Sequence, residues 1–538
     1  MSVSRVDTLG VRRQDLDDDL TIVEDDLVVE THADAGRPAP RIPAWVWVAA
    51  ILVVATAIRV WQLNRIGFNS DETVYAGQAA SIAGNVTLQK FFPIYRAHPL
   101  LFQTILSGIY RVTTSDFLAR LLSVGFGVAT VYVTYLLGRL LYGRRAGLIA
   151  AALLAVMPYH VVVSRQVLLD GPMVFFSTLT LYLLAKYAVT QRSVWLYATG
   201  AGMGLTFLSK ETGFVLVAAV YAFLALAPRV KVRVRDLAIS GAVLFLIMLP
   251  YPVSLYFGKS SKTGKSFFAW QLLRRPNHGV LFYASTVPAA LGFIVLAAAI
   301  AGLLIMRRER SWRETLLLSW ILVPVAFFSL WPVKGFQYLL PIAPPVAVLA
   351  ARAFARLPAN PRERFGRTSI PALAVTGVVG VAVALSLILP TVQRITPSKS
   401  GTFLAGSGGV AGGREAGEWV GAHVPENAQL LALGPSMANI IEFYGDRKTY
   451  GLSVSTNPLH RNPVYEALSN PDLQIRRGDL QYLVWDSYSA NRSPHFAGKL
   501  LQFAEKYHGR VVHSESVDVT AGGQKTKKRV IVIYEVRP

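Results

Sequence analysis

The feature that most limits how this chain can fold is a series of apolar runs, each long enough to cross a lipid bilayer. Hydrophobic residues make up 53% of the 538 residues, and charged residues only 16%. Because about 20 apolar residues span the hydrocarbon core as a helix, this pattern is typical of a polytopic α-helical membrane protein rather than of a large soluble enzyme. We predict about eleven transmembrane helices, at residues 43–63, 117–141, 146–163, 171–189, 193–209, 211–227, 236–257, 281–305, 314–331, 337–356 and 370–390.

The net charge of +22 follows from membrane topology and does not indicate binding to nucleic acid. If the N-terminus is cytoplasmic, every connection that falls on the inside is basic, as the positive-inside rule requires, and faces anionic membrane lipid. One external connection, residues 258–280, breaks the rule because it carries Lys259, Lys262, Lys265, Arg274 and Arg275. We therefore expect a multi-pass protein of the cell membrane with a cytoplasmic N-terminus and one basic external loop that needs a separate explanation.

The composition changes three times along the chain. Residues 1–40 are acidic and polar, and we predict a disordered cytoplasmic tail. Residues 41–395 form the predicted membrane domain, whose first external loop is 64–116. A linker rich in Gly and Ser follows at 396–413, and residues 414–538 have the composition of a soluble α/β domain. By parity this domain lies outside the cell.

Within residues 414–538, the apolar periodicity predicts strands at 428–433, 480–485 and 529–535 and helices at 414–422 and 495–507. The chain contains no cysteine, which excludes disulfides, thiolate catalysis and metal sites built on cysteine.

Two adjacent carboxylates, Asp71 and Glu72, follow the first predicted span and open a helical run to Ala83, with Ser70 as the expected N-cap. The structural alternative is a solvated helix start, where acidic side chains favour the positive end of the helix dipole. A functional role is favoured because polar residues otherwise costly at span ends gather on the same predicted face. These residues are His98, Arg165, Asp170, Lys210, Glu211 and Lys334.

Each of these residues also has a purely structural interpretation. His98 precedes Pro99 and fits an exposed turn, and Arg165 is suited to reach a lipid headgroup. Lys210 and Glu211 suit a paired turn between two spans, and Asp170 suits a helix N-cap. Their accumulation at one membrane face instead predicts a polar cleft.

Such a cleft suits group transfer from an anionic donor embedded in the lipid. Basic residues hold a phosphate and stabilise the charge that grows on it as it leaves. A phosphate leaving group needs no general acid, so one carboxylate suffices as the base for an acceptor hydroxyl. The basic loop 258–280 is then expected to lie over the donor. The alternative is a lipid-linked sugar flippase or transporter with an outward-facing polar cavity, although transporters place charge near the midplane and show internal repeats.

Seven short motifs follow one another through the predicted membrane domain: Asp71-Glu72, His98-Pro99-Leu100, Ala119-Arg120-Leu121, Gly138-Arg139-Leu140-Leu141-Tyr142-Gly143, Ser164-Arg165-Gln166 through Leu169-Asp170, Leu208-Ser209-Lys210-Glu211-Thr212-Gly213 and Gln337-Tyr338-Leu339-Leu340-Pro341. In this order and spacing they resemble membrane glycosyltransferases of the GT-C fold, in the protein O-mannosyltransferase and lipid A aminoarabinose transferase group. The likeness covers about residues 43–356.

This resemblance implies an inverting, mannosyltransferase-like enzyme that moves a sugar from a polyprenyl-phosphate donor to a hydroxyl of a protein, glycan or lipid. It implies catalytic roles for Asp71 and Asp170, with Glu72 beside them. The donor phosphate is expected to meet Lys210, Arg165, Lys334, Gln337 and Tyr338. The remaining substrate contacts are expected from His98, Glu211, Lys262, Lys265, Arg274 and Arg275.

Two departures from the family pattern concern the site. Gln337-Tyr338 stands where many relatives have Arg-Tyr, which leaves Lys334 as a replacement charge, and His98-Pro99-Leu100 stands where His-Pro-Pro is common. The soluble part matches no named family, and we expect it to bind the acceptor because it faces the same side as the cleft. A divalent metal held by Asp71, Glu72, Asp170 and His98 stays open, since their spacing does not enforce one.

Overall fold

A computed structural model describes residues 43–94, 97–257, 270, 276–305, 311–356, 372–396, 411–458, 460–521 and 524–538. The predicted tail 1–40 and most of the predicted linker 396–413 lie outside the described residues. So do the basic residues predicted to contact substrate, Lys262, Lys265, Arg274 and Arg275.

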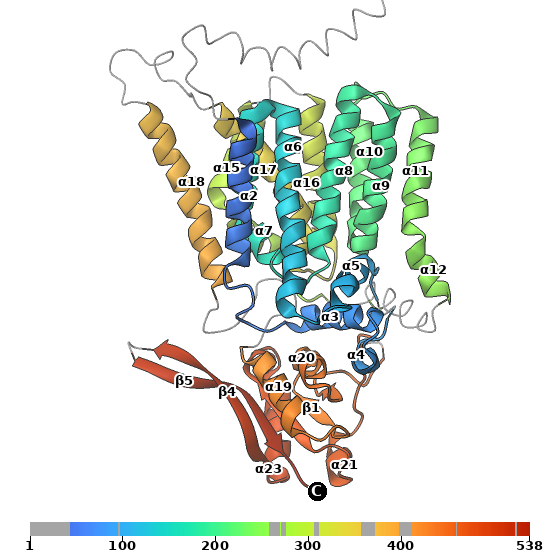
Figure 1. Ribbon diagram of the computed structural model, residues 1–538, viewed down its shortest axis with the longest axis vertical. Coiled ribbons are helices and arrows are strands. Elements are labelled where there is room, and N and C mark those ends of the chain that lie inside the picture. Colours follow the sequence, from blue (N-terminus) through green and yellow to red (C-terminus); the bar gives the residue numbers. More distant parts are fainter. Residues whose placement is uncertain are drawn as a thin grey trace, which may run out of the picture.

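The membrane part is a bundle of helices standing side by side (Figure 1). Its elements are α2 (Ala44–Val60), α6 (Asp116–Val156), α7 (Pro158–Val163), α8 (Asp170–Thr190), α9 (Ser193–Ser209), η1 (Glu211–Phe214), α10 (Val215–Leu226), α11 (Val234–Met248), α12 (Pro250–Phe257), α14 (Phe282–Leu291), α15 (Phe293–Ile305), α16 (Trp312–Leu330), η3 (Phe336–Ile342), α17 (Ala343–Ala355) and α18 (Ala372–Ile395).

Within the described residues, six helices are long and apolar enough to cross a membrane. A seventh is added if α14 and α15, which meet at an angle of 94°, count as one span. The prediction of a polytopic α-helical membrane protein is thus confirmed. The number eleven stays a prediction, although each of the eleven predicted segments carries a helix.

The long element α6 is two helices rather than one. Tyr142 and Gly143 have non-helical dihedral angles, and the φ of Gly143 is +86°. A Cβ added to Gly138 would lie 2.9 Å from the Cα of Gly147, whereas residues nine apart in a straight helix are about 13.5 Å apart. The chain therefore reverses at Gly143, a backbone conformation that glycine adopts without steric penalty. Two antiparallel helices pack closely through these small residues.

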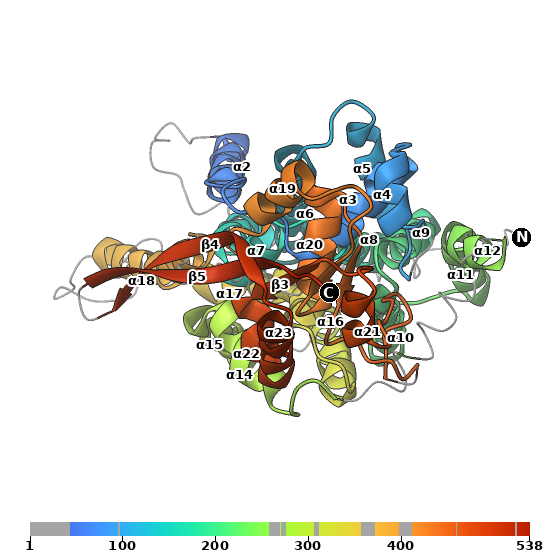
Figure 2. The ribbon, with the colours of Figure 1, turned by 90° about the horizontal axis from the view of Figure 1, so that it is seen from below.

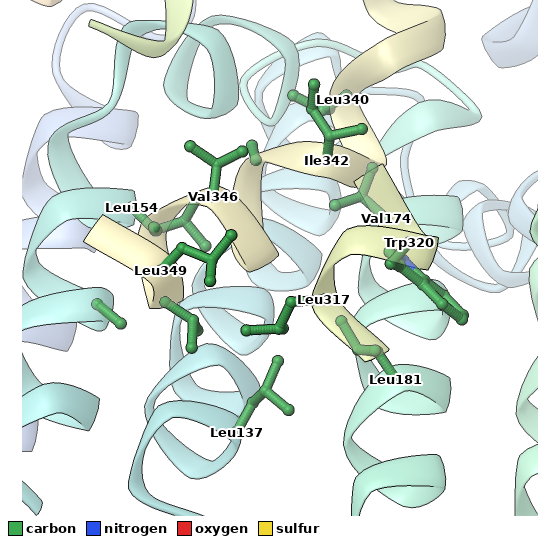
Figure 3. Packing of buried hydrophobic residues seen from close by; sticks show 14 of the residues in the cluster. Leu137, Leu154, Val174, Leu181, Leu317, Trp320, Leu340, Ile342, Val346 and Leu349 are labelled. Atoms are coloured by element: carbon green, nitrogen blue, oxygen red, sulfur yellow. The ribbon is translucent and has the colours of Figure 1, made fainter. Parts of the chain in front are cut away.

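The centre of the bundle is filled by interlocking apolar side chains from α6, α8, α16 and α17 (Figure 3). Leu137, Leu181, Leu317, Trp320 and Leu349 are all buried there. Because lipid is as apolar as these side chains, close packing rather than transfer from water holds such helices together. The result is a rigid support for the polar residues at the ends of the helices.

The C-terminal unit is a five-stranded sheet with helices on both faces, in the strand order β2-β1-β3-β5-β4. β1 pairs in parallel with β2 and β3, and β5 pairs antiparallel with β3 and β4. Its elements are α19 (Gly413–His423), β1 (Leu430–Ala432), α20 (Pro435–Gly445), β2 (Thr449–Gly451), α21 (Pro471–Arg476), β3 (Tyr482–Asp486), α22 (Ser487–Arg492), α23 (Pro494–Lys506), β4 (Arg510–Ala521) and β5 (Gln524–Glu535).

The pleat of β1 explains the two-sided core of this unit. Leu430 and Ala432 point to the face covered by α19 and α20, while Leu431 and Leu433 point to the face covered by α21 and α23. Alternate residues of a strand project to opposite sides of a sheet, so a continuous apolar run fits a strand covered on both faces. The strands predicted at 428–433, 480–485 and 529–535 are present as β1, β3 and β5.

The C-terminal unit lies at one end of the bundle, together with α3 (Ser70–Ile82), α4 (Val86–Phe91) and α5 (Leu101–Tyr110) (Figure 1). Seen from that end, it covers much of the bundle (Figure 2). The basic connections between α8 and α9 and between α10 and α11 lie at the opposite end. The first predicted external loop and the C-terminal unit therefore share one side of the bundle.

Candidate active site

A cavity of about 1300 Å³ lies between the bundle, α3 and the C-terminal unit. Its polar and aromatic lining residues include Asp71, Tyr75, Gln78, His98, Lys210, Glu211, Asn277, His278, Lys334, Gln337, Tyr338, Ser436, Ser453, Ser455, Arg461, Asn462, Tyr488 and Arg492. Typical pockets for one small molecule measure roughly 300–1000 Å³. The cavity is therefore large enough for two reactants to meet in it.

Asp71 is placed by the capped N-terminus of α3. The Asn69 side chain accepts a hydrogen bond from the Glu72 amide at 3.0 Å, and the Glu72 carboxylate accepts one from the Asn69 amide at 3.0 Å. This reciprocal pair is a capping box, so the N-cap is Asn69 and the predicted N-cap Ser70 was wrong by one residue. Asp71 lines the cavity from the first turn of α3.

Glu72 is turned away from the cavity and is fully buried. The Arg120 guanidinium, also buried, donates to both of its carboxylate oxygens at 2.8 and 2.7 Å. The Val167 amide donates to Glu72 Oε1 at 3.0 Å. With these partners and the capping box, Glu72 has its hydrogen-bonding capacity filled and is not positioned to contact a substrate.

Lys210 and Asp170, which are predicted to share one face, are in direct contact. Lys210 Nζ lies 2.8 Å from both carboxylate oxygens of Asp170 and 5.0 Å from the ring centroid of Tyr338. Lys210 lines the cavity, whereas Asp170 is buried behind it and does not. Asp170 therefore reaches the cavity only through Lys210.

His98 and Glu211 form a second pair on the cavity wall, with His98 Nδ1 2.8 Å from Glu211 Oε2. The His98 ring meets the edge of Tyr75 at a centroid distance of 6.1 Å. Burial raises the pKa of Tyr75, and the negative charge of Asp71 raises it further. The Tyr75 hydroxyl therefore stays protonated near the carboxylates.

Lys334, Gln337 and Tyr338, for which the sequence predicts donor binding, also line the cavity. Lys334 Nζ donates to the Trp331 carbonyl at 2.8 Å. The backbone of Lys334 exchanges hydrogen bonds with the Asn277 side chain at 2.8 and 2.9 Å, which fixes the segment before α14 against it.

Arg165 is not brought to the cavity. Its Nη1 donates to the carbonyls of Ile58, Arg59 and Trp61 at 3.0, 2.7 and 2.8 Å. These carbonyls lie at the C-terminal end of α2, where helical partners run out. Arg165 thus closes the end of a helix instead of facing the donor phosphate predicted for it.

The C-terminal unit supplies cavity residues that the sequence interpretation missed. The short helix α22 is capped by Asp486, whose Oδ1 accepts a hydrogen bond from the Ser489 amide at 2.7 Å. It brings Tyr488 and Arg492 to the cavity, where Arg492 Nη1 donates to the Tyr488 hydroxyl at 2.6 Å. Burial raises the pKa of Tyr488, and the charge of Asp71 contributes to that shift. No local motif marks these residues.

Another part of the C-terminal unit, helix α20, holds the chain that leads into Asp71. The Asn439 amide of α20 donates to Ser70 Oγ at 2.9 Å. The Phe68 amide donates to the Tyr444 hydroxyl at 2.8 Å, and that hydroxyl donates to Asp116. The residues directly before Asp71 are therefore fixed by the C-terminal unit.

Among the described residues, no group of three or more His, Cys, Asp or Glu side chains is arranged to hold a metal ion. Of the four residues considered from the sequence, Glu72 is bound to Arg120 and Asp170 to Lys210.

Comparisons with known proteins show similarity in sequence and in fold. Residues 97–256 match the family described as dolichyl-phosphate-mannose-protein mannosyltransferase. The chain is 27% identical over 353 residues to undecaprenyl phosphate-alpha-4-amino-4-deoxy-L-arabinose arabinosyl transferase of Yersinia pestis, covering 61% of this chain and 62% of that one. It is 32% identical over 182 residues to dolichyl-phosphate-mannose–protein mannosyltransferase 1 of Candida albicans, covering 31% of this chain and 19% of that one.

Among solved structures, the crystal structure of ArnT from Cupriavidus metallidurans bound to undecaprenyl phosphate superposes with a TM-score of 0.63 at 17% identity. The superposition covers 91% of this chain and 98% of that chain. By sequence, the chain spans 62% of the length of the curated arabinosyl transferases that it matches.

The fold defines the class as a polytopic membrane protein with the GT-C fold. Within that class, the resemblance to the protein O-mannosyltransferase and aminoarabinose transferase group is confirmed by the family match and by the curated relatives.

Proposed function

We propose that this chain is a glycosyltransferase that moves a sugar from a polyprenyl-phosphate donor to an acceptor hydroxyl at the outer face of the membrane. The observation that carries the proposal is one cavity that combines Asp71 with Lys210, Lys334 and Tyr338 at the end of the bundle next to the C-terminal unit. The relatives are named for dolichyl-phosphate and undecaprenyl-phosphate sugars. Those sugars differ, mannose in one case and aminoarabinose in the other, so the proposal rests on the shared lipid phosphate.

The proposed chemistry is a single displacement that inverts the anomeric centre. The acceptor oxygen forms a bond to the anomeric carbon as the bond from that carbon to the phosphate oxygen breaks. Asp71 takes the proton of the acceptor hydroxyl, as a positioned general base does. The electron pair of the broken bond leaves with the lipid phosphate, which needs no added proton.

Lys210 and Lys334 are proposed to stabilise the charge that grows on the leaving phosphate. Two of the three Lys210 donors are directed at Asp170, which fixes the ammonium group and leaves one donor for the phosphate. Asp170 is therefore a positioning residue for Lys210. Glu72 is a positioning residue in the same sense, because with Arg120 it fixes the start of α3.

The proposed topology has eleven spans, a cytoplasmic N-terminus and an external C-terminal unit. The basic connections at the end of the bundle away from this unit support that orientation through the positive-inside rule. The count of eleven includes the bent pair α14 and α15 as one span and the two arms of α6 as two. It is completed by α2, α9 and η1–α10, each 17 residues or shorter. The lipid donor then enters the cavity from the outer leaflet.

The alternative of a flippase or transporter is not favoured, because the matching relatives are named as transferases. In addition, the paired ionisable residues Lys210–Asp170 and His98–Glu211 gather at one end of the bundle rather than at its middle.

The test is Asp71→Asn in the purified chain, reconstituted in liposomes with polyprenyl-phosphate sugars as donors. Transfer, followed by mass spectrometry, should fall at least about a hundredfold, because a positioned base contributes roughly 10²–10⁴ in rate. Donor binding should be retained. The matched control is Asp479→Asn, at an exposed carboxylate away from the cavity. Transfer at the wild-type rate by the Asp71 variant would refute the assignment, and translocation of intact donor without transfer would favour the transporter.

A further inference from the structure

The charges on the cavity wall do not balance. Of the two carboxylates among the described lining residues, Glu211 is paired with His98. Lys210 is neutralised by Asp170 behind it. Lys334, Arg461 and Arg492 also line the cavity, and within the described part of the chain none of these three has a carboxylate within ion-pairing distance. Against these three cations stands one further carboxylate, Asp71.

Two of the three cations come from the C-terminal unit, and Arg492 is held in a defined place. Its Nη1 donates to the Tyr488 hydroxyl at 2.6 Å, and its guanidinium lies 5.4 Å from the centroid of that ring. Nε and Nη2 donate to no acceptor among the described residues. An arginine with such an open edge is suited to grip a carboxylate or phosphate with two parallel hydrogen bonds.

The rest of this wall also favours an anion. The described lining residues of the C-terminal unit contain no carboxylate, and the polar ones beside Arg461 and Arg492 are hydroxyls, an amide and an imidazole: Ser436, Ser453, Ser455, His460, Asn462, Tyr465 and Tyr488. Because this wall contains hydrogen-bond donors and positive charges but no acidic group, it attracts an anion, and its arginines are not paired with a carboxylate of the wall.

The imidazole of His278 lines the cavity where charges from both of its sides act on it. Burial lowers the pKa of His278, and the positive charges of Arg492 and Lys334 lower it further. Its ring is stacked on Phe282 at a centroid distance of 4.1 Å. One cation from the C-terminal unit and one from the bundle therefore act on the same part of the cavity.

The charges of Asp71 and of the donor together do not balance three cations. A polyprenyl-phosphate sugar is a phosphodiester and brings one negative charge, which the bundle residue Lys334 can meet together with Lys210. We infer that Arg461 and Arg492 form a second anion site, which takes a phosphate or carboxylate group of the acceptor next to the hydroxyl that Asp71 activates. This inference rests on the proposed function and narrows the acceptor to a hydroxyl compound that carries negative charge.

The test uses the full chain in nanodiscs saturated with undecaprenyl phosphate, which occupies the donor site. Glycerol 3-phosphate, a hydroxyl compound with one phosphate, is titrated by calorimetry, with glycerol as the uncharged control. The wild-type chain should bind glycerol 3-phosphate and not glycerol. Arg461→Gln and Arg492→Gln should each weaken that binding by at least about tenfold, because each loses at least one charge-assisted hydrogen bond. Their affinity for undecaprenyl phosphate should change less than about twofold.

Two further variants separate recognition from folding. Arg492→Lys keeps the charge and loses the planar fork, so glycerol 3-phosphate binding should fall less than in Arg492→Gln. Arg477→Gln removes an exposed arginine of the same unit that does not line the cavity, and it should bind like the wild type.

The inference is overturned if the saturated wild-type chain binds no glycerol 3-phosphate. It is also overturned if Arg492→Gln weakens undecaprenyl phosphate instead, which would make Arg492 a ligand of the donor. Absence of sugar transfer by a wild-type chain that still binds both probes would count against the proposed function and leave the anion site standing.

Discussion

The C-terminal unit meets the rest of the chain through two regions of opposite character. Where α20 lies on α3, polar atoms are paired across the boundary: Asn439 with Ser70, and Tyr444 with the Phe68 amide. Where α22 faces the bundle, the boundary opens into the cavity, and Arg492 keeps donors unused among the described residues. The sealed region fixes the position of Asp71, and the open region leaves space and charge for substrates.

The same division is visible between two adjacent side chains. Successive residues of a helix project about 100° apart, so Asp71 and Glu72 cannot face the same way. Glu72 points into the bundle and meets Arg120, while Asp71 points into the cavity. One carboxylate of the pair thus fixes α3 to the bundle beside the sealed region, and the other lines the open region.

The largest effect is expected from Arg120→Met, which removes the contact that fixes α3 to α6 beside the sealed region. Arg120 neutralises the buried Glu72 and also donates to the carbonyls of Leu63, Ile66 and Gly67. Leaving a buried charge without its partner costs about 3–5 kcal/mol. The thermal unfolding midpoint of the purified chain should fall clearly, and the double variant with Glu72→Gln should recover part of the loss. An unchanged midpoint in the single variant would contradict the assigned role of Arg120.

The features of the sealed and open regions could be predicted from the sequence to different degrees. The spans follow from apolar length, a local property, and the placement of Asp170 and Lys210 on one face follows from the order of the spans. Their direct contact was not predicted, because the sequence suggested Glu211 as the partner of Lys210. The partners of the Arg165 side chain could not be predicted in this way. An arginine at the end of a span can reach a headgroup or close a neighbouring helix, and only the position of α2 decides which.

The cavity residues of the C-terminal unit were harder still to predict from the sequence. Arg492 and Tyr488 lie on a six-residue helix far along the chain from Asp71, and no short-range pattern reports such proximity. The long strand β4 was also missed, because its sequence is largely polar and two irregularities, at Val511/His513 and Glu515/Ser516, interrupt its alternation. Its place is set by pairing with β5.

The next effect concerns the pH dependence of stability and Asp486, which caps the helix α22 of the open region. Burial raises the pKa of Asp486 from 3.8 to about 6, and its Oδ2 is buried with no hydrogen-bond partner among the described residues. The folded chain therefore holds this proton more tightly than the unfolded chain. Its stabilising contribution is complete below about pH 4 and is lost as pH rises through 6, by at most ~3 kcal/mol at 1.36 kcal/mol per pKa unit.

Asp486→Asn should remove this dependence, since asparagine also caps α22 and does not ionise. Thermal midpoints of both proteins are measured from pH 4.5 to 7.5. Relative to the variant, the wild type should lose stability across this range, and the variant should be the more stable protein above pH 6. Parallel pH profiles for the two proteins would show that the cap of α22 is not titrating.

The smallest effects come from two matched tyrosines, one in each region. Tyr444→Phe deletes the partner of the Phe68 amide and of Asp116, which should cost about 1 kcal/mol of stability and lower kcat by loosening the chain before Asp71. Tyr488→Phe removes a hydroxyl at the cavity wall and should change stability by less than ~0.5 kcal/mol. It should instead raise the KM for the acceptor, because Arg492 loses its anchor. If both variants changed kcat and left KM alone, the distinction between a sealed and an open region would fail, since each hydroxyl would then act only through the placement of Asp71.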